Sequence, residues 1–356
     1  MQHALTRRRR LLAAMALAMA PGVRAASEDA FGALRLPAIA VRAPEKAVLL
    51  AATTAGQRLV AVGERGVVAL SDDGAQHWHQ ARGVPVSVTL TAVAFADARN
   101  GWAVGHGGVV LATHDGGEQW TLLIDGRGLG TVALDAARAH PEQVALTKAA
   151  ELLVADGPDK PLLALQVIDA QRLFVVGAYN LAFESNDAGR TWHAALDRMD
   201  NPTARHLNAL AVRGDTWLIA GEQGLLLRSR DGGRSFQRLN SPYAGSWFAL
   251  QAVGTDAWVV AGLRGKAFRS TDDGEHWTAL EGAPAASFVS AAVLPGGGVL
   301  LANQAGQLFT NQNGSALTAM PVPALPPVNQ VLRLPNGDLL ALTLAGAIRL
   351  PAKAAP

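Results

Sequence analysis

A repeating unit of about twenty residues constrains the fold of this chain more than any other feature. Five copies share one register: a glycine, a serine or threonine eight residues later, an aspartate two residues further on, and an aromatic residue five after that. The first glycines of the copies are Gly63, Gly105, Gly177, Gly221 and Gly262. Repeats of this kind indicate that one supersecondary unit is stacked or arranged in a ring.

Each unit alternates apolar runs with turn signals. In the second copy, the apolar run before Gly105 predicts a buried strand, and Gly105–Gly108 predicts a hairpin, because glycine adopts positive φ at little cost. Another strand follows, and then Thr113–Trp120 predicts a second hairpin, in which the aspartate accepts backbone N–H groups. With the upstream strand Leu90–Phe95, the unit has four strands in about 42 residues, which is typical of a propeller blade.

Two degenerate units follow the five regular ones. Asn303–Gly306 keeps the spacing but loses the later aspartate and tryptophan, and Thr343–Gly346 keeps only its second glycine. We therefore expect an all-β chain that forms a seven-bladed β-propeller of four-stranded blades over residues 26–350.

The last unit ends after its third strand, near Leu350. The apolar stretch Leu34–Val41 precedes the first blade, so we expect it to supply the missing fourth strand, close the ring and remove an exposed edge. Residues 351–356 are expected to form a disordered tail.

One interval departs from the repeat. Trp120 and Trp192 lie 72 residues apart, about thirty more than one blade needs. Apolar spacing predicts a helical insertion at about 134–155, with Pro141 at its first helical position. The insertion connects the outer strand of the second blade to the inner strand of the third. It should therefore lie on the same face as the Gly-x-x-Gly hairpins, with its apolar stripe at the channel mouth.

The N-terminus has the features of a signal peptide. Arg7–Arg10 form a charged segment, Leu11–Ala20 a short apolar one, and Val23–Ala25 a cleavage site, which predicts export to the periplasm with cleavage near Ala25. The general secretion route is favoured, with the twin-arginine route as the alternative. No other segment is long and apolar enough to suggest a transmembrane helix.

Charge and cysteine content exclude several classes of function. Removing residues 1–25 takes away five arginines and no acidic residue, which leaves 26 basic against 29 acidic residues, a net charge of −3. Such a balance gives no support to nucleic-acid binding. The chain has no cysteine, so it has neither disulfides nor thiolate metal sites.

The pattern V-G-x-x-G followed by S/T-x-D-x-G-x-x-W resembles the Asp-box, or bacterial neuraminidase, repeat. Over about residues 45–350 it is similar to the photosystem II stability and assembly factor family. The segments Asp156–Pro161, Ala204–Ala209 and Ser241–Ser246 resemble the non-photosynthetic bacterial branch of that family. The resemblance implies a non-catalytic scaffold or assembly factor in the cell envelope, without cofactors. Its partner would be a protein in a membrane-associated complex, with an exporter as one candidate.

The Gly-x-x-Gly corners differ from blade to blade, as an asymmetric binding surface requires, so we expect the functional surface there. Photosynthetic members of the family are described as holding a photosystem subunit with an arginine patch; the corners here offer two arginines. The candidate partner-binding residues are Arg65, His106, Tyr179, Arg205, His206, Asn208, Glu222, Tyr243, Trp247 and Arg264.

The Asp-box residues are expected to be structural, because equivalent positions of separate blades lie far apart around a ring. They are Asp73, Asp115, Asp187, Asp231 and Asp272, with the aromatic residues Trp78, Trp120, Trp192, Phe236 and Trp277. His77 and His79 could chelate a metal, but no acidic third ligand accompanies them in sequence, so no metal site is predicted.

Two alternatives remain open. A sialidase-like glycoside hydrolase would need an arginine cluster, a tyrosine nucleophile with a glutamate partner, and an aspartate acid. The chain has only Tyr179 and Tyr243 and no matching arginine set, so we expect no enzyme. A carbohydrate-binding propeller could instead use Tyr243, Trp247, Phe248, Arg205 and Asn208 at the channel mouth, although Trp247 and Phe248 also suit an inner-strand core.

Overall fold

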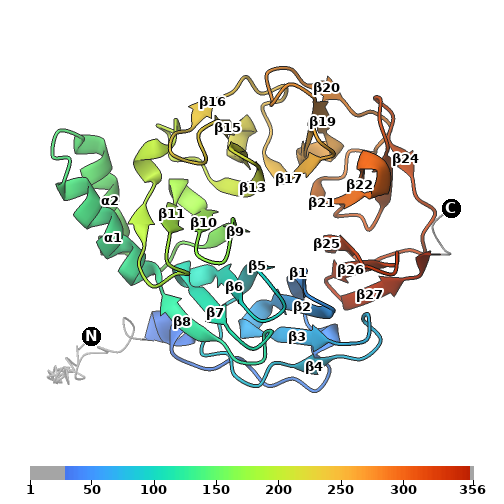
Figure 1. Cartoon of the computed structure of the whole chain (residues 1–356), viewed down its shortest axis with the longest axis horizontal. Helices are drawn as coiled ribbons and strands as arrows, with labels where there is room; N and C mark the ends of the chain where they lie inside the picture. Colours follow the sequence, from blue (N-terminus) through green and yellow to red (C-terminus); the bar gives the residue numbers. More distant parts are fainter. Residues whose placement is uncertain (1–28, 353–356) are drawn as a thin grey trace, which may run out of the picture.

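The computed structural model describes residues 29–352, which form seven antiparallel sheets arranged in a ring (Figure 1). Six sheets have four strands and the seventh has three. The prediction of an all-β, seven-bladed propeller is therefore confirmed. The predicted signal peptide, residues 1–25, and the last four residues of the predicted tail lie outside the described residues.

Strands follow one another from the centre of the ring to its rim in every blade. In blades 1 to 3 they are β1 Leu49–Ala55, β2 Arg58–Gly63, β3 Val68–Ser71 and β4 His79–Gln80; β5 Leu90–Phe95, β6 Gly101–Gly105, β7 Val110–Thr113 and β8 Thr121–Ile124; β9 Leu162–Val167, β10 Leu173–Gly177, β11 Ala182–Ser185 and β12 His193–Ala194. In blades 4 and 5 they are β13 Leu207–Arg213, β14 Thr216–Gly221, β15 Leu226–Ser229 and β16 Gln237–Arg238; β17 Trp247–Val253, β18 Ala257–Gly262, β19 Ala267–Ser270 and β20 Thr278–Ala279. In blades 6 and 7 they are β21 Phe288–Leu294, β22 Gly298–Asn303, β23 Leu308–Asn311 and β24 Thr318–Ala319; β25 Val328–Arg333, β26 Leu339–Thr343 and β27 Gly346–Leu350.

Apolar clusters between neighbouring blades form the core. The second strand of each blade is almost wholly buried, as in β6 and β14. Large side chains from adjacent blades meet there, for example Phe174 and Trp217, whose ring centroids are 5.3 Å apart. Because each blade is covered on both faces by its neighbours, the stability of the ring depends on the packing at every junction between blades.

The Asp-box aromatic residues fill one repeated position in these junctions. Trp120 of blade 2 packs against Val60 and Leu70 of blade 1, and Phe236 of blade 4 packs against Phe174 of blade 3. Trp192 and Trp277 likewise pack on the preceding blade, and Trp78 packs on blade 7. In each case the bulky side chain seals the outer part of the junction.

The ring closes without the predicted strand. Leu34 ends the 3₁₀ helix η1 (Asp29–Leu34) and packs in the core of blades 1 and 2, and the Ala38 N–H donates to the Val84 carbonyl at 3.0 Å. The segment Leu34–Val41 thus runs past blades 1 and 2, so the expectation that it would complete blade 7 was wrong. Instead, Asn329 of blade 7 donates to the Leu49 carbonyl of blade 1 at 2.9 Å.

The insertion consists of two helices and lies at the rim. α1 (Gly126–Arg138) and α2 (Val144–Asp156) form an antiparallel pair beside blade 3 (Figure 1). Leu129, Ala133 and Ala137 of α1 pack with Trp192 of blade 3. The predicted helical insertion is confirmed, but it consists of two helices, and the second begins at Val144 rather than at Pro141. The expectation that its apolar stripe lies at the channel mouth was wrong, because the apolar residues of α1 pack on blade 3.

Within residues 29–352, no helix is long and apolar enough to cross a membrane.

Candidate functional site

The turns that join the second and third strands lie on one face of the ring, which we call the hairpin face. Its corners are the single 3₁₀ turns Glu64–Gly66, His106–Gly108, Ala178–Asn180, Glu222–Gly224 and Leu263–Gly265. Antiparallel strands alternate in direction, so the Asp boxes lie on the opposite face, which we call the Asp-box face. α1 contacts His106–Gly108, as expected for a connection on the hairpin face.

Corner geometry turns a central side chain outwards in four of these five hairpins; the central residue of the fifth is Gly107. Arg65, Tyr179, Gln223 and Arg264 have left-handed φ between 51° and 57°, a conformation that costs a non-glycine residue energy. Except after Tyr179, where Asn180 follows, the next residue is a glycine that lies against the loop of the next blade, so that a Cβ on Gly224 would be 2.4 Å from the Tyr243 carbonyl. The corner backbone is therefore fixed, while its central side chain is free to vary.

The structure brings four predicted residues together between blades 3 and 4. The Tyr179 ring meets the His206 ring edge-on at 4.7 Å, and the Tyr179 N–H donates to His206 Nδ1 at 3.1 Å. The His206 N–H donates to Glu222 at 3.3 Å. Lys160 lies over the Tyr179 ring at 5.5 Å, and Arg205 adjoins His206 in the chain. We call Lys160, Tyr179, Arg205, His206 and Glu222 the Tyr179 cluster.

Arg205 is the least satisfied member of this cluster. One of its terminal nitrogens donates to the Gln223 carbonyl at 3.2 Å, and its backbone is held by Asn201. Its Nε is buried and has no hydrogen-bond partner among residues 29–352. A buried donor without a partner costs free energy, and because this nitrogen is covered by the chain's own atoms, it does not itself present a site to an outside acceptor.

The other predicted residues are dispersed. Arg65, His106 and Arg264 are exposed at the corners of blades 1, 2 and 5, so the two corner arginines do not form a patch. Tyr243 is half-buried and packs on Trp247 at 5.7 Å. Trp247 is fully buried in the junction of blades 4 and 5, so its assignment as a partner-binding residue was wrong.

A central channel opens on the hairpin face, and its lining follows from one irregularity. Each innermost strand has a register shift next to its second residue, which leaves that residue unpaired and facing the channel. The seven residues, one per blade, are Leu50, Thr91, Leu163, Asn208, Phe248, Val289 and Asn329. They line a cavity of about 710 Å³ that contains no Asp or Glu among its described lining residues.

Polar members of this ring tie blades together. Thr91 donates to the Leu162 carbonyl at 2.6 Å, and Asn208 donates to the Trp247 carbonyl at 2.9 Å. The amide of Asn208, which was predicted to bind a partner, is therefore already used in the scaffold. Phe248 is 36% exposed and presents an aromatic face to the channel instead.

The Asp boxes form turns. Asp115 accepts from the backbone N–H groups of Glu118 and Gln119, both at 3.0 Å, and from Thr113 at 2.9 Å. Hydrogen bonds from the side chain and backbone of Thr191 lower the pKa of Asp187 to about 2, and those from Ser235 and Ser229 lower the pKa of Asp231 to about 2. These carboxylates are stabilised as anions by their own turns.

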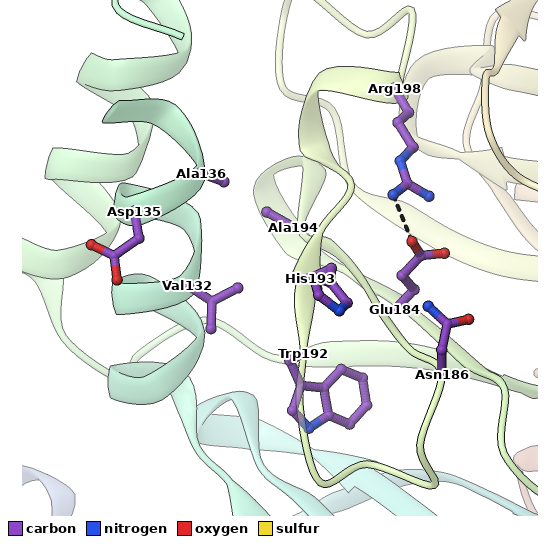
Figure 2. A pocket seen from close by; sticks show the side chains of 9 residues that line it. All are labelled: Val132, Asp135, Ala136, Glu184, Asn186, Trp192, His193, Ala194 and Arg198. Carbon is purple, nitrogen blue, oxygen red and sulfur yellow. Dashed lines mark hydrogen bonds and ion pairs between the residues drawn. The ribbon is translucent and has the colours of Figure 1, made fainter. Parts of the chain in front are cut away.

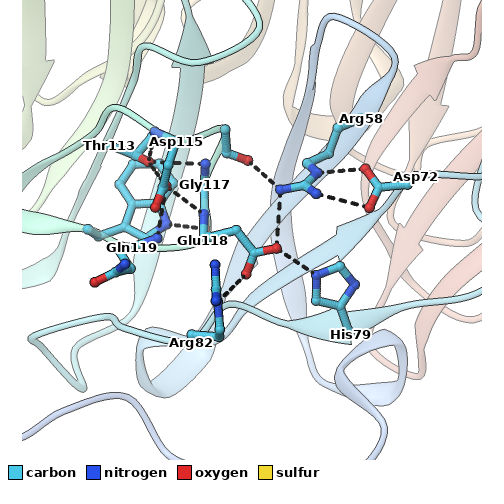
Figure 3. A network of polar contacts seen from close by, with 11 residues as sticks. Arg58, Asp72, His79, Arg82, Thr113, Asp115, Gly117, Glu118 and Gln119 are labelled. Carbon is cyan, nitrogen blue, oxygen red and sulfur yellow. Dashed lines mark hydrogen bonds and ion pairs between the residues drawn. The ribbon is translucent and has the colours of Figure 1, made fainter.

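A polar network links the first two Asp boxes (Figure 3). Arg58 forms an ion pair with Asp72 at 2.6 Å and reaches Glu118 of blade 2 at 3.3 Å, while His79 meets Glu118 at 3.1 Å. No group of three metal-ligating side chains occurs in the described part of the chain. The network therefore ties blade 1 to blade 2.

A second cavity, of about 610 Å³, separates α1 from blade 3 (Figure 2). Val132 and Ala136 face it from the helix, and the ion pair between Glu184 and Arg198, at 2.6 Å, lies on the blade side. Because this ion pair already satisfies both charges, the cavity offers no free charged group of that pair to a ligand.

One residue of the hairpin face, Lys160, was not among the predicted site residues. Lys160 lies in the segment Asp156–Pro161, which was noted for its resemblance but not as a site. Phe248 was expected either at the channel mouth or in the core, and the register shift of β17 places it in the channel. A residue pattern that assumes strict alternation of buried and exposed positions along a strand does not predict this orientation of Phe248.

Several proteins of known structure share this fold. YCF48 bound to D1 peptide superposes with a TM-score of 0.65 at 17% identity, and YCF48 from Cyanidioschyzon merolae with 0.66 at 11%; both cover 88% of this chain and 98% of theirs. A GH74 enzyme from Niastella koreensis gives 0.61 at 14%, covering 88% of this chain and 53% of the enzyme. At these identities the similarity shows the fold alone.

Sequence comparison is more specific. A stretch of 95 residues is 32% identical to the Photosystem II assembly lipoprotein Ycf48 of Synechococcus sp. (strain CC9902), covering 26% of this chain and 28% of that protein. Residues 150–343 match the family described as Photosynthesis system II assembly factor YCF48. Because this match covers more than half of the 356 residues, the chain belongs to the YCF48 family.

Proposed function

We propose that this chain is a non-catalytic assembly or stability factor that binds a protein partner on its hairpin face. A relative of the same fold has been solved with a D1 peptide, which supports a protein as the ligand. We further propose that the chain is exported to the periplasm after cleavage near Ala25, and that its partner belongs to a membrane-associated complex of the envelope, such as an exporter.

The Tyr179 cluster is the observation that carries this proposal. Tyr179 is 57% exposed although it is aromatic, and it is held by His206 and Lys160 rather than by the core. Exposed aromatic and arginine side chains on a rigid scaffold are typical of the strongest contacts in protein interfaces. Arg205 is half-buried beside His206 and adds a positive charge to this surface.

The hydrolase alternative receives less support from the site. Glycoside hydrolysis generally needs a pair of carboxyl groups facing the bound sugar, and the described lining of the channel cavity has none. The GH74 enzyme shares the fold, but fold alone does not carry an activity across.

A pull-down from envelope extracts tests the proposal. The triple variant Lys160→Ala, Tyr179→Ala, Arg205→Ala should lose the subunits of one membrane complex that the wild-type chain retains. The matched control is Arg190→Ala, Arg234→Ala, since both arginines are exposed on the Asp-box face. Loss of the same subunits in the control and their retention in the triple variant would overturn the assignment.

Export has its own test. N-terminal sequencing of the protein recovered from the periplasm should begin at Ala26. Recovery of the chain in the cytoplasm with an intact N-terminus would contradict this part of the proposal.

A further inference from the structure

Blade 7 lacks two features that the other six blades have. Among residues 29–352 it has no fourth strand, and no side chain of its own occupies the position that the Asp-box aromatic residues fill elsewhere. Blade 6 has lost its Asp box but keeps a large apolar residue at this position, Leu317, which is 7% exposed in the core of blades 5 and 6. The junction between blades 6 and 7 is therefore the one in the described chain that lacks this residue.

A cavity of about 380 Å³ lies at that junction. Thr310 and Met320 line it from the third and outer strands of blade 6, and Leu339 lines it from blade 7. The equivalent surfaces of blades 4 and 5 enclose Trp277, which lies with Leu218 and Leu239 around Gly274. The cavity thus corresponds to the position that an aromatic side chain fills in the five regular blades, and we call it the vacant slot.

The strand beside the vacant slot has a free edge. In blades 1 and 6 the residue after the outer strand donates to the third strand: Ala81 to the Val68 carbonyl, and Met320 to the Leu308 carbonyl, both at 2.9 Å. The register of β26 and β27 places Ala347 at the equivalent position, and no described residue donates to its carbonyl. Residues 347–349 are correspondingly half-buried, whereas the same stretch of β3 is buried.

Chemistry at the slot favours an aromatic occupant. Leu339 and Met320 provide apolar walls, and the guanidinium of Arg333 lines the slot without a hydrogen-bond or ion-pair partner among residues 29–352. An unpaired guanidinium stacks favourably on an aromatic face. Residues 353–356 are Lys-Ala-Ala-Pro, so they bring no aromatic side chain.

We propose that the vacant slot is a docking site for an extended segment of a partner protein. The segment adds to the free edge of β27 and inserts an aromatic side chain where the regular blades place their own. Backbone pairing at a sheet edge supplies affinity, and a pocket for one side chain supplies specificity. The site lies on the rim, next to the outer strand of blade 6, so it is separate from the hairpin face and independent of the function proposed above.

The chain itself supplies the probe. A fluorescein-labelled peptide of residues 114–124 contains an Asp-box turn and the outer strand of blade 2, and the same peptide with Trp120→Ala is its control. In fluorescence polarisation, the full chain should bind the first peptide at least tenfold more tightly than the second. Equal affinity for the two peptides, or no binding of either, would overturn the proposal.

Two protein variants locate the binding. Thr318 and Thr278 are both exposed first residues of an outer strand, in blades 6 and 5, but only Thr318 lines the vacant slot. Thr318→Trp should weaken peptide binding at least tenfold, while Thr278→Trp should leave it unchanged. Equal effects of the two would show that the peptide binds elsewhere.

A graft completes the test. Replacing residues 351–356 with residues 114–124 should fill the slot from within, abolish peptide binding and raise the melting temperature. Undiminished binding by this chimera would contradict the assignment. If a chain that starts at residue 26 bound the peptide tenfold more tightly than the full chain, the occupant would be the chain's own N-terminus. If the chain formed a dimer that Thr318→Trp abolished, the occupant would be a second copy. Either result would overturn the choice of a partner protein.

Discussion

The two faces of this propeller are built by the same seven blades but obey different rules. On the Asp-box face, one turn is repeated with the same bonds: Ser229 and Asp231 of blade 4 bond as Ser270 and Asp272 of blade 5 do. On the hairpin face, the turn is repeated but its outward residue is not, from Arg65 to Tyr179 to Gln223. Within one repeat, the conserved turn therefore serves the fold, while the variable side chain at its corner is available for recognition.

The largest effect should come from an Asp-box aromatic residue. Trp120 is 5% exposed, packs on blade 1 and donates to the Gly117 carbonyl at 2.8 Å. Trp120→Ala should lower the free energy of unfolding by about 3–5 kcal/mol in urea titrations. If the Trp120→Ala variant kept full stability but no longer captured the partner, the Asp-box face would not be purely structural.

Removing an Asp-box carboxylate should have a smaller effect. Asp231→Ala leaves the N–H groups of Arg234 and Ser235 without their acceptor, which should cost about 1–3 kcal/mol in the same assay. Asp115→Ala should behave alike. Asp256→Ala, at an exposed turn residue, is the control and should change the unfolding free energy little. Any loss of binding by the folded Asp231 variant would contradict a structural role.

The first Asp box contains a strained residue that can be relieved. Ala75 has φ of 67°, where the other four boxes have a glycine with positive φ. Ala75→Gly should therefore stabilise the chain by about 1 kcal/mol, unlike most glycine substitutions. A decrease in the melting temperature would show that the Ala75 methyl group, which packs near Trp78, matters more than the strain.

Acid should act on the Asp-box face first. The pKa values of Asp187, Asp231 and Asp272 are lowered to about 2 in the fold, below the ordinary value of 3.8. Their contribution is complete above the unfolded-state pKa and is lost as the pH falls from about 4 to about 2. The unfolding midpoint in urea should decline over this window, and Asp231→Asn should make the decline shallower. If Asp231→Asn left the pH dependence of the unfolding midpoint unchanged, the hydrogen bonds of the Asp231 carboxylate would not contribute to stability.

The smallest effect on stability is expected at the corners. Tyr179→Ala and Arg264→Ala remove side chains that face solvent, so each should change the unfolding free energy by less than about 0.5 kcal/mol. Of the two, only Tyr179→Ala should impair partner capture, since only Tyr179 belongs to a cluster. A large stability loss at Tyr179 would indicate that the cluster serves the fold.

The fold could be predicted from the sequence in the five regular units, where the same motif recurs. The spacing of the five regular units fixed the strand order and the turn role of the Asp boxes, because the same local bonds recur in each. Prediction failed for α1, whose Gly126, Gly128 and Gly130 lower helix propensity. There the Asp125 cap, which accepts from the N–H groups of Arg127 and Gly128, and packing on blade 3 override propensity.

The candidate site was predicted only in part, for a similar reason. Tyr179 belongs to blade 3, whereas His206 and Glu222 belong to blade 4, and nothing in their spacing reveals that Tyr179 meets the other two. Their contact depends on the junction of two blades, which is a tertiary property. Trp247 and Phe248 were both expected either at the channel mouth or in the core, and a register shift, invisible in the residue pattern, sets which of the two faces the channel.

The ring is closed by side-chain contacts between blades 7 and 1 and not by a strand shared between the two ends of the chain. This has a consequence for folding during synthesis. Every sheet is assembled from one continuous stretch, such as residues 49–80 for the first and 328–350 for the last. Each blade can therefore pair its strands as soon as its own stretch has been synthesised, without waiting for the other end of the chain. Short-range pairing of this kind favours rapid folding and limits the time for which strand edges stay open to other chains.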